Sequence, residues 1–367
     1  MIKFAKKAIM GKYTFILLGI ISFNCTNPLY SQKSVTENTE AKSIKYPEEK
    51  YFKSIKQLTF GGDNAEAYFS FNDKMLTFQV TNPDWKISCD QIFFSSIENF
   101  NPSLVSTGKG RTTCSYFLPG DSLVLYSSTH EYSEECPPKP APREDRKYIW
   151  PIYDSFDIYV ADLKGNIKRK LTDLPGYDAE ATLSPKGDKI VFTSLRNGDL
   201  DLYTMNIDGT NVIQITHELG YDGGAFFSPD GKNLIFRASR PKSEEEIRTY
   251  KNLLSQGQVM PTQMEIYTCK IDGSGLRQVT TLGGANWAPY YSKDGKNIIF
   301  SSNHVKKGYH FNLWMCKLDG SNLRQITFDP VFDAFPVFSR DGKRLVFSSN
   351  RNNNGGHNTN LFIAEWK

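Results

Sequence analysis

The chain has 367 residues, 39% of them apolar, with 44 Lys and Arg residues against 40 Asp and Glu residues. Four of the lysines, Lys3, Lys6, Lys7 and Lys12, precede the first apolar run, and without them 40 basic residues balance 40 acidic ones. This balance gives no reason to expect a nucleic acid or an anionic membrane surface as a partner. The length exceeds an average domain, but closed all-β architectures often reach it as one unit.

Residues 1–31 are typical of an export signal. Its basic start carries no acidic residue and is followed by the apolar run 15–23, which is short for a membrane span. Cys25 follows this run and resembles the acylated cysteine of bacterial lipoproteins. Alternatively, cleavage follows Ser31. Both alternatives predict an exported protein, periplasmic or associated with the outer membrane, and the first adds a lipid anchor.

Residues 32–52 are polar and charged without periodicity, and we expect a flexible leader there. A repeat occupies the rest of the chain. Tyr177-Asp178 and the turn at 184–187 (Ser-Pro-Lys-Gly) return 44 residues later as Tyr221-Asp222 and the turn at 228–231 (Ser-Pro-Asp-Gly). Self-similarity at this spacing indicates a repeat architecture.

One period contains four short β segments, separated by Ser-Pro-x-Gly and Asp-Gly turns. Four strands in about 40 to 45 residues are typical of one propeller blade. The predicted strands of this period are residues 179–183, 188–194, 200–206 and 212–216.

Six such blades follow one another, and the last has only three strands of its own before Lys367. The segment 54–59 ends in Gln-Leu-Thr, which matches the last strand of other blades, so it is expected to complete blade six and close the ring. We therefore predict one all-β domain over residues 53–367, a six-bladed propeller of antiparallel four-stranded blades. The expected first strands begin near Glu66, Thr113, Ala179, Gly223, Asn286 and Asp333.

Two blades carry insertions. Residues 129–154 are rich in proline and are expected to be irregular. Residues 240–262 predict one short helix, because Ser243 to Glu246 form a capping box and Gly257 provides a stop. The apolar residues between these signals recur at helical spacing, at Ile247, Tyr250 and Leu254.

The Ser-Pro-Asp-Gly-Lys turns, the Asp-Gly turns and the Tyr-Asp pairs resemble the WD40-like (PD40) repeats of the TolB propeller family. The resemblance covers about residues 54–366. It implies a six-bladed propeller exported to the cell envelope.

In a propeller, the loops between second and third strands and the connections between blades open on one face. Polar residues at the start of the blades are expected to surround the mouth of the central channel there. As an alternative, a repeated Asp can hold the blade junction, so the unrepeated Arg111 and Trp287 are better ligand candidates. The predicted ligand-binding residues are Arg111, Asp178, Glu180, Asp222, Asn286, Trp287 and Asp333.

All five histidines fall in loops of this same face. Convergent imidazoles could hold one divalent metal ion or act as a general base, and a resemblance in repeat type to oligogalacturonate lyases implies such a metal. The alternative is that these are solvated loop residues spread around a wide ring. They are His130, His217, His304, His310 and His357.

Five cysteines follow Cys25. Cys269 and Cys316 lie in equivalent third strands and are expected in the core. The others map near the open face of blades one and two, where an oxidising compartment favours a disulfide. We predict Cys114 to Cys136 as the first choice and Cys89 to Cys114 as the second.

The sequence contains no nucleophile elbow, no phosphate-binding loop and no metalloprotease helix. The favoured function is a non-catalytic, monomeric scaffold without cofactor, which binds an envelope protein or a glycan through its loop-rich face. The alternative is a metal-dependent lyase or hydrolase of polysaccharide fragments that uses the histidines.

Overall fold

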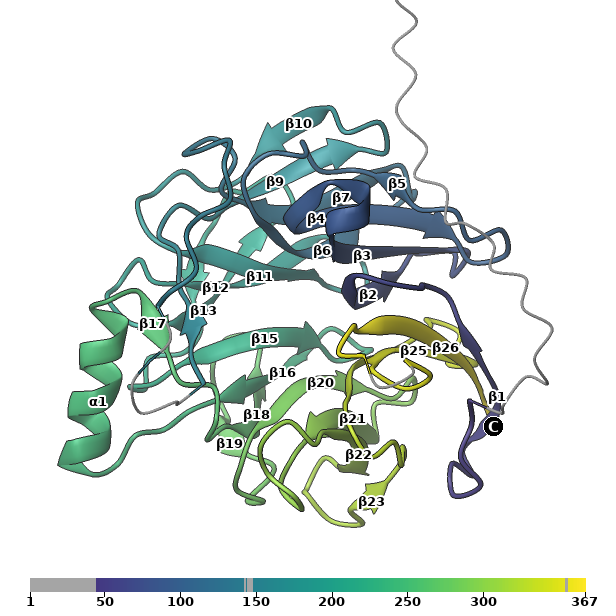
Figure 1. Cartoon of the computed structure of the whole chain (residues 1–367). Helices are drawn as coiled ribbons and strands as arrows, with labels where there is room; N and C mark the ends of the chain where they lie inside the picture. The colour runs from purple at the N-terminus through teal and green to yellow at the C-terminus, as the bar shows by residue number, and fades with distance from the viewer. Residues whose placement is uncertain (1–43, 142, 144–147, 354–355) are drawn as a thin grey trace, which may run out of the picture.

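The computed structural model describes residues 44–141, 143, 148–353 and 356–367, and these form six four-stranded sheets arranged around a central axis (Figure 1). Every pairing within a blade is antiparallel. The predicted six-bladed propeller is confirmed. The first strand of each blade contacts the first strands of its neighbours, so these strands line the axis. The export signal predicted at residues 1–31, with Cys25, lies outside the described residues.

The blades follow chain order. Blade one contains β2 (Asp63–Phe69), β3 (Met75–Asn82), β4 (Ile87–Ser96) and β5 (Ser103–Leu104), with the short helix η1 (Pro83–Trp85) between β3 and β4. Blade two contains β6 (Thr112–Phe117), β7 (Leu123–Ser128), β9 (Asp157–Asp162) and β10 (Ile167–Lys170). Blade three contains β11 (Asp178–Leu183), β12 (Lys189–Ser194), β13 (Asp201–Asn206) and β14 (Ile213–Gln214).

The second half of the ring repeats this order. Blade four contains β15 (Asp222–Phe227), β16 (Asn233–Ala238), β18 (Glu265–Lys270) and β19 (Arg277–Gln278). Blade five contains β20 (Asn286–Tyr291), β21 (Asn297–Ser302), β22 (Asn312–Lys317) and β23 (Arg324–Gln325). Blade six contains β24 (Asp333–Phe338), β25 (Arg344–Ser349), β26 (Asn360–Trp366) and the amino-terminal β1 (Phe52–Gln57).

The core between blades is aromatic and repeats with the sequence. The fourth residue of every second strand is a large aromatic side chain with at most 1% of its surface exposed. Such residues suit strands that are covered on both faces, because their rings fill the space between neighbouring sheets. These residues are Phe78, Tyr126, Phe192, Phe236, Phe300 and Phe347.

The two ends of the chain close the ring. β1 pairs antiparallel with β26, Gln57 opposite Phe362, and the Leu58 amide donates to the Leu361 carbonyl at 2.8 Å (Figure 1). The Thr59 hydroxyl accepts from the Leu361 amide at 2.8 Å, just as Thr216 does from Leu202 in blade three. This shared bond accounts for the threonine of the triplet, and the side-chain amides of Gln57 and Gln214 both donate to the carbonyl of that threonine.

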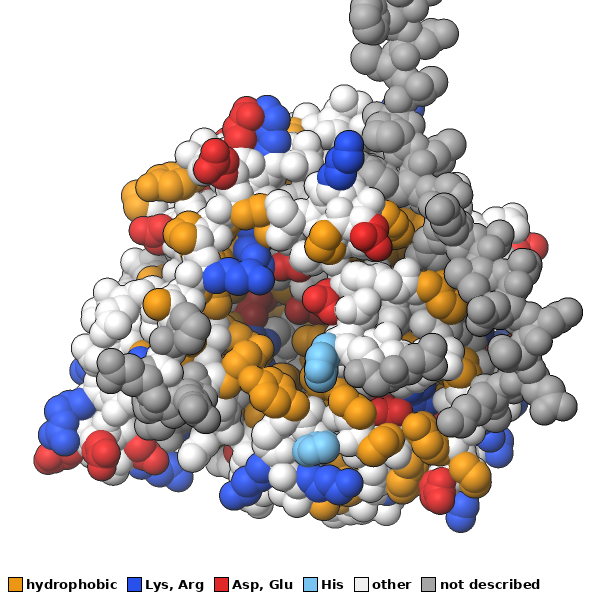
Figure 2. All heavy atoms as spheres, in the orientation of Figure 1, with side chains coloured by type: hydrophobic (Ala, Val, Ile, Leu, Met, Phe, Trp, Pro, Cys, Tyr) orange, Lys and Arg blue, Asp and Glu red, His pale blue; other side chains and the backbone are white. Residues whose placement is uncertain are grey.

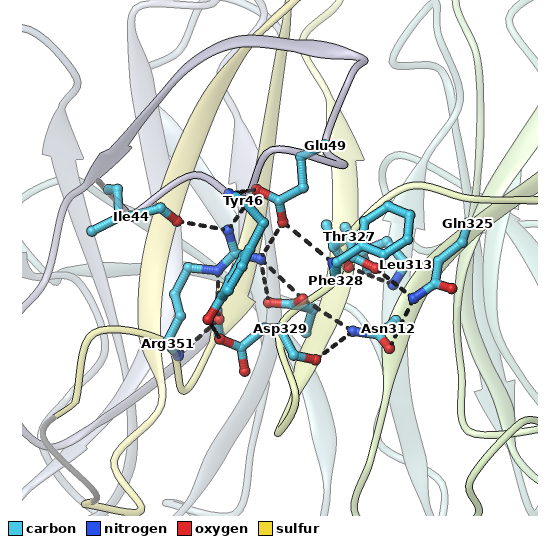
Figure 3. Close-up of polar contacts among 12 residues, drawn as sticks. Ile44, Tyr46, Glu49, Asn312, Leu313, Gln325, Thr327, Phe328, Asp329 and Arg351 are labelled. Atoms are coloured by element: carbon cyan, nitrogen blue, oxygen red, sulfur yellow. Dashed lines mark hydrogen bonds and ion pairs between the residues drawn. The ribbon is translucent and has the colours of Figure 1, made fainter. Parts of the chain in front are cut away.

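A buried charge cluster ties the segment before β1 to blade six (Figure 3). The Arg351 guanidinium lies between the Glu49 carboxylate at 2.9 Å and the Asp333 carboxylate at 3.0 Å, and all three side chains are at most 1% exposed. Tyr46 donates to Asp329 at 2.9 Å. The expectation of a flexible leader over residues 32–52 is therefore wrong for residues 44–52, because a distant arginine holds Glu49. Residues 32–43 lie outside the described part.

The predicted helix is confirmed as α1 (Glu244–Leu254), which lies at the outside of the ring (Figure 1). Both hydrogen bonds of the Ser243 to Glu246 capping box are present, and Gly257 has a positive φ after the end of the helix. Tyr250 and Leu253 are its buried residues. Among the described residues, no helix has the length and apolarity needed to cross a bilayer.

We expect Arg351→Leu to destabilise the protein by about 3–5 kcal/mol, because it leaves the Glu49 and Asp333 carboxylates buried without their cation. Urea unfolding followed by tryptophan fluorescence measures this change. Arg248→Leu, on the exposed surface of α1, is the matched control and should stay within about 0.5 kcal/mol of wild type. Equal midpoints for the two variants would contradict the assigned role of the cluster.

Candidate functional site

Each of the six axial strands contains a β-bulge, and the bulged residue has a left-handed backbone conformation. The register shifts lie at equivalent points of β2, β6, β11, β15, β20 and β24. Bulges re-aim side chains, and positive φ at residues other than glycine is uncommon enough to mark functional positions. The six equivalent residues, with φ between 43° and 58°, are Glu66, Cys114, Glu180, Gly224, Ala288 and Phe335.

These six positions, here called the axial ring, have diverged around the axis. Blades one to three place two carboxyl groups and a thiol there, whereas blades five and six place a methyl group and a phenyl ring. Blade four has Gly224 at this position, and Arg237 occupies the space that a side chain there would need. A β-carbon at Gly224 would lie 2.0 Å from Arg237 Nη1. Within the axial ring, one side is therefore polar and the opposite side is apolar.

The axial ring lines a cavity of about 370 Å³. Figure 2 shows a hollow in the middle of this face, with acidic, basic and hydrophobic side chains around it. At its floor, Tyr68 packs on Tyr116 and on Phe226, with ring centroids 5.3 and 5.9 Å apart. Phe226 also lines a second cavity on the opposite side, so these rings close the channel.

The two insertions meet at the mouth of the cavity. β8 (Trp150–Pro151), from blade two, pairs antiparallel with β17 (Gln258–Val259), from blade four, and the strap so formed passes over blade three. Trp150, Ile152 and Tyr153 of the first insertion line the cavity. The sequence predicted an irregular insertion here, and the short strand β8 corrects that prediction.

Arg237 is held in the polar wall by a dense set of contacts. It pairs with Glu180, donates to the Tyr221 hydroxyl at 2.7 Å, and stacks at 5.1 Å from the Trp150 ring centroid. Glu180 also accepts from Tyr221, from Thr193 and from the Gly224 amide at 2.8 to 2.9 Å. Burial raises the pKa of Glu180, but Arg237 and these hydrogen bonds outweigh it, so the pKa lies below its usual value.

Glu66 and Cys114 form the other polar corner. The Cys114 thiol donates to Glu66 Oε2 at 2.9 Å. Burial raises the pKa of Glu66 to about 7, and burial together with the nearby carboxylates raises the pKa of Cys114 well above its usual value. The thiol is thus a hydrogen-bond donor at neutral pH and not a thiolate nucleophile.

The structure separates the predicted ligand residues into two groups. Arg111, Glu180 and Trp287 line the cavity; Arg111 pairs with Asp90, and the Trp287 indole donates to the Pro261 carbonyl at 2.8 Å. The other four start axial strands but are buried outside the cavity lining, which fits the alternative that they hold blade junctions. These are Asp178, Asp222, Asn286 and Asp333.

The three aspartates each pair with an arginine placed 18 residues later, at the exit of the second strand. The pairs are Asp178 with Arg196, Asp222 with Arg240, and Asp333 with Arg351.

In blades two and five, His130 and His304 occupy the position that the paired arginines have in blades three, four and six, directly after the second strand. Their Nδ1 atoms lie 2.9 and 2.8 Å from the hydroxyls of Ser128 and Ser302, and their rings pack on aromatic residues of the third strand. His310 Nδ1 lies 2.6 Å from the Pro330 carbonyl oxygen, while His217 and His357 are exposed. In the described part of the chain, no three His, Cys, Asp or Glu side chains converge to hold a metal ion. The histidines therefore give the predicted metal site no support.

Both predicted disulfides are wrong. Cys89 bonds to Cys136, with the Cα atoms 6.0 Å apart, and Cys114 is free. The bulge turns Cys114 toward Glu66 and the axis, away from the insertion that carries Cys136. Cys269 and Cys316 are buried in the core as predicted.

Sequence reasoning missed Arg237, Trp150 and Tyr221 as site residues. Arg237 sits inside a buried second strand where the pattern predicts a core residue, and Trp150 belongs to an insertion outside the repeat. One signal was present: Gly224 occupies the repeat position of Glu180, and its missing side chain marks the space that Arg237 fills.

Peptide mapping without reduction should recover a cross-link between Cys89 and Cys136, with Cys114 recovered as a free thiol. Loss of this bridge in Cys89→Ser should destabilise the protein, since a loop of 47 residues corresponds to about 4 kcal/mol in the chain-entropy account. Cys316→Ser keeps the bridge and serves as the control for the mapping. A cross-link to Cys114 would contradict the assignment.

The stability contributed by Glu66 should depend on pH. Because the folded state raises its pKa from 4.5 to about 7, the folded state binds the proton more tightly than the unfolded state. The stability gained from this proton is full below about pH 4.5 and is lost as the pH rises through 7. The urea midpoint of wild type should therefore fall more between pH 5 and pH 8 than that of Glu66→Gln, and parallel curves would contradict the shift.

Comparison with known proteins agrees with the propeller fold. Residues 152–262 match the PD40 family, described as the TolB beta propeller domain. No curated protein is significantly similar in sequence. The fold resembles the TolB-type structure from Agrobacterium tumefaciens, with 19% identity, a TM-score of 0.56, and coverage of 85% of this chain and 97% of that chain.

Two further solved structures share the fold. TolB from Acinetobacter baumannii has 18% identity and a TM-score of 0.53, with coverage of 83% of this chain and 64% of that one. A gluconolactonase from Xanthomonas campestris has 12% identity and a TM-score of 0.54, with coverage of 86% and 89%. Such identities show a shared fold alone. The chain is thus a six-bladed β-propeller with a fold similar to that of TolB, and its residues 152–262 match the PD40 family.

Proposed function

We propose that this protein is an exported, non-catalytic propeller that binds a carbohydrate in its axial cavity. The observation that carries the proposal is the two-sided wall of that cavity. Glu66, Cys114 and Arg237 offer hydrogen-bonding groups on one side, and Ala288 and Phe335 offer an apolar surface on the other. A pyranose ring has the matching character, with hydroxyl groups along its edges and C–H groups on its faces.

The size of the cavity supports a small ligand more than a docked protein. About 370 Å³ lies at the lower end of the volumes that hold small ligands, and those sites also combine aromatic walls with a few placed polar groups. A protein partner needs about 800 Å² of contact on each side. A terminal sugar of a glycan can enter such a cavity while the rest of the chain leaves past the strap.

Export is supported by two independent features. Residues 1–31 have the pattern of a signal segment, with acylation at Cys25 as the alternative to a free mature chain. The Cys89–Cys136 disulfide is the kind of bond that persists in an oxidising compartment such as the periplasm.

A glycan array followed by calorimetry tests the proposal. Wild type should bind a defined set of glycans, and Trp150→Ala should weaken that binding by about tenfold or more, because it removes an aromatic wall of the cavity. Tyr132→Ala is the matched control, since Tyr132 belongs to the same insertion, is 81% exposed and lies outside the cavity. Unchanged glycan affinity in Trp150→Ala would place the binding elsewhere, and the absence of any glycan binding would overturn the function.

A further inference from the structure

The ionisable groups of the axial cavity do not all pair with one another. Its lining contains three carboxyl groups and two guanidinium groups. Arg111 pairs with Asp90, and Arg237 pairs with Glu180. Among the described residues, Glu66 is the one carboxyl group of the lining without an ion-pair partner, and its single hydrogen bond comes from the Cys114 thiol.

A thiol is a weak donor, so it compensates little of the cost of burying a carboxylate. On the described strands around Glu66, the one nearby cation is Arg237. Cys114 lies on β6, Glu180 on β11 and Asp90 on β4, while the guanidinium of Arg237 on β16 is committed to Glu180. The cavity lining also contains aromatic rings, namely Tyr68, Trp150, Tyr177 and Tyr221, of which Trp150 and Tyr221 pack on Arg237.

We propose that the axial cavity recognises a protonated amine, which sits against the Glu66 carboxylate and between the aromatic rings. The ammonium group supplies the missing cation, and the rings add cation–π attraction. Together with the proposed function, on which the sugar part rests, this makes the ligand a carbohydrate with a free amino group. The amino group itself is inferred from the carboxyl and guanidinium groups of the lining and does not depend on the sugar part.

The lack of an ion-pair partner for Glu66 disfavours two other ligand classes. A uronate or another anionic sugar brings a second negative charge to Glu66, and like charges in a desolvated site repel strongly. An N-acetylated sugar fits the aromatic walls but has a neutral amide where the cation is needed. It should therefore bind more weakly than the free amine.

Calorimetry at pH 7 with the trimer of glucosamine and the trimer of N-acetylglucosamine separates these classes. Wild type should bind the free amine about tenfold or more tightly than the acetylated trimer. Glu66→Gln keeps the shape of the side chain and should lose this preference while retaining its affinity for the acetylated trimer, which also reports that the variant is folded. Glu244→Gln, an exposed residue of α1, is the matched control and should keep the preference.

The pH response gives a second readout. Lowering the pH from 7 to 5 protonates Glu66, so the preference of wild type for the amine should shrink toward that of Glu66→Gln. Equal affinity for both trimers in wild type overturns the amine inference and leaves the carbohydrate function standing. Binding of hexylammonium that depends on Glu66, with no binding of either trimer, supports the amine inference and overturns a glucosamine oligomer as the ligand. Failure of all three probes to bind overturns the amine inference, and the glycan array then decides the carbohydrate function separately.

Discussion

Closure of the ring is the constraint on which the other features of this propeller depend. A four-stranded blade cannot cover its own faces, and an open ring would leave one blade edge and one axial strand exposed. The backbone bonds between β1 and β26 remove this edge, and the cluster around Arg351 locks the segment that precedes β1. Only a closed ring keeps six axial strands at fixed positions around one cavity.

The site arises because six equivalent positions need not carry the same residue. Each axial strand turns one bulged residue toward the axis, so the backbone repeats while the side chains are free to differ. Polar residues gather in blades one to three, and Gly224 admits Arg237 from the next strand. A symmetric scaffold thereby produces an asymmetric cavity with one polar and one apolar wall.

The repeat also distinguishes two kinds of charged residue, those that form ion pairs between strands and those that face the cavity. Asp178, Asp222 and Asp333 recur because each forms the same ion pair with an arginine at a blade exit. His130 and His304 take the place of that arginine, which explains why histidines lie in similar loops without converging. Among the charged residues that face the cavity, Arg237 has no charged counterpart in the other blades, and Glu66 recurs only as Glu180.

Period, turn residues and strand patterns along the chain were sufficient to predict the number of blades, the completion of blade six by the first strand, and α1. Each of these rests on local turn chemistry or on a pattern that recurs. The cysteine pairing, the Glu49 to Arg351 contact and the entry of Arg237 into the space above Gly224 were decided by the tertiary structure. They join residues 47, 302 and 13 positions apart, and only the curvature of the closed ring brings such side chains together.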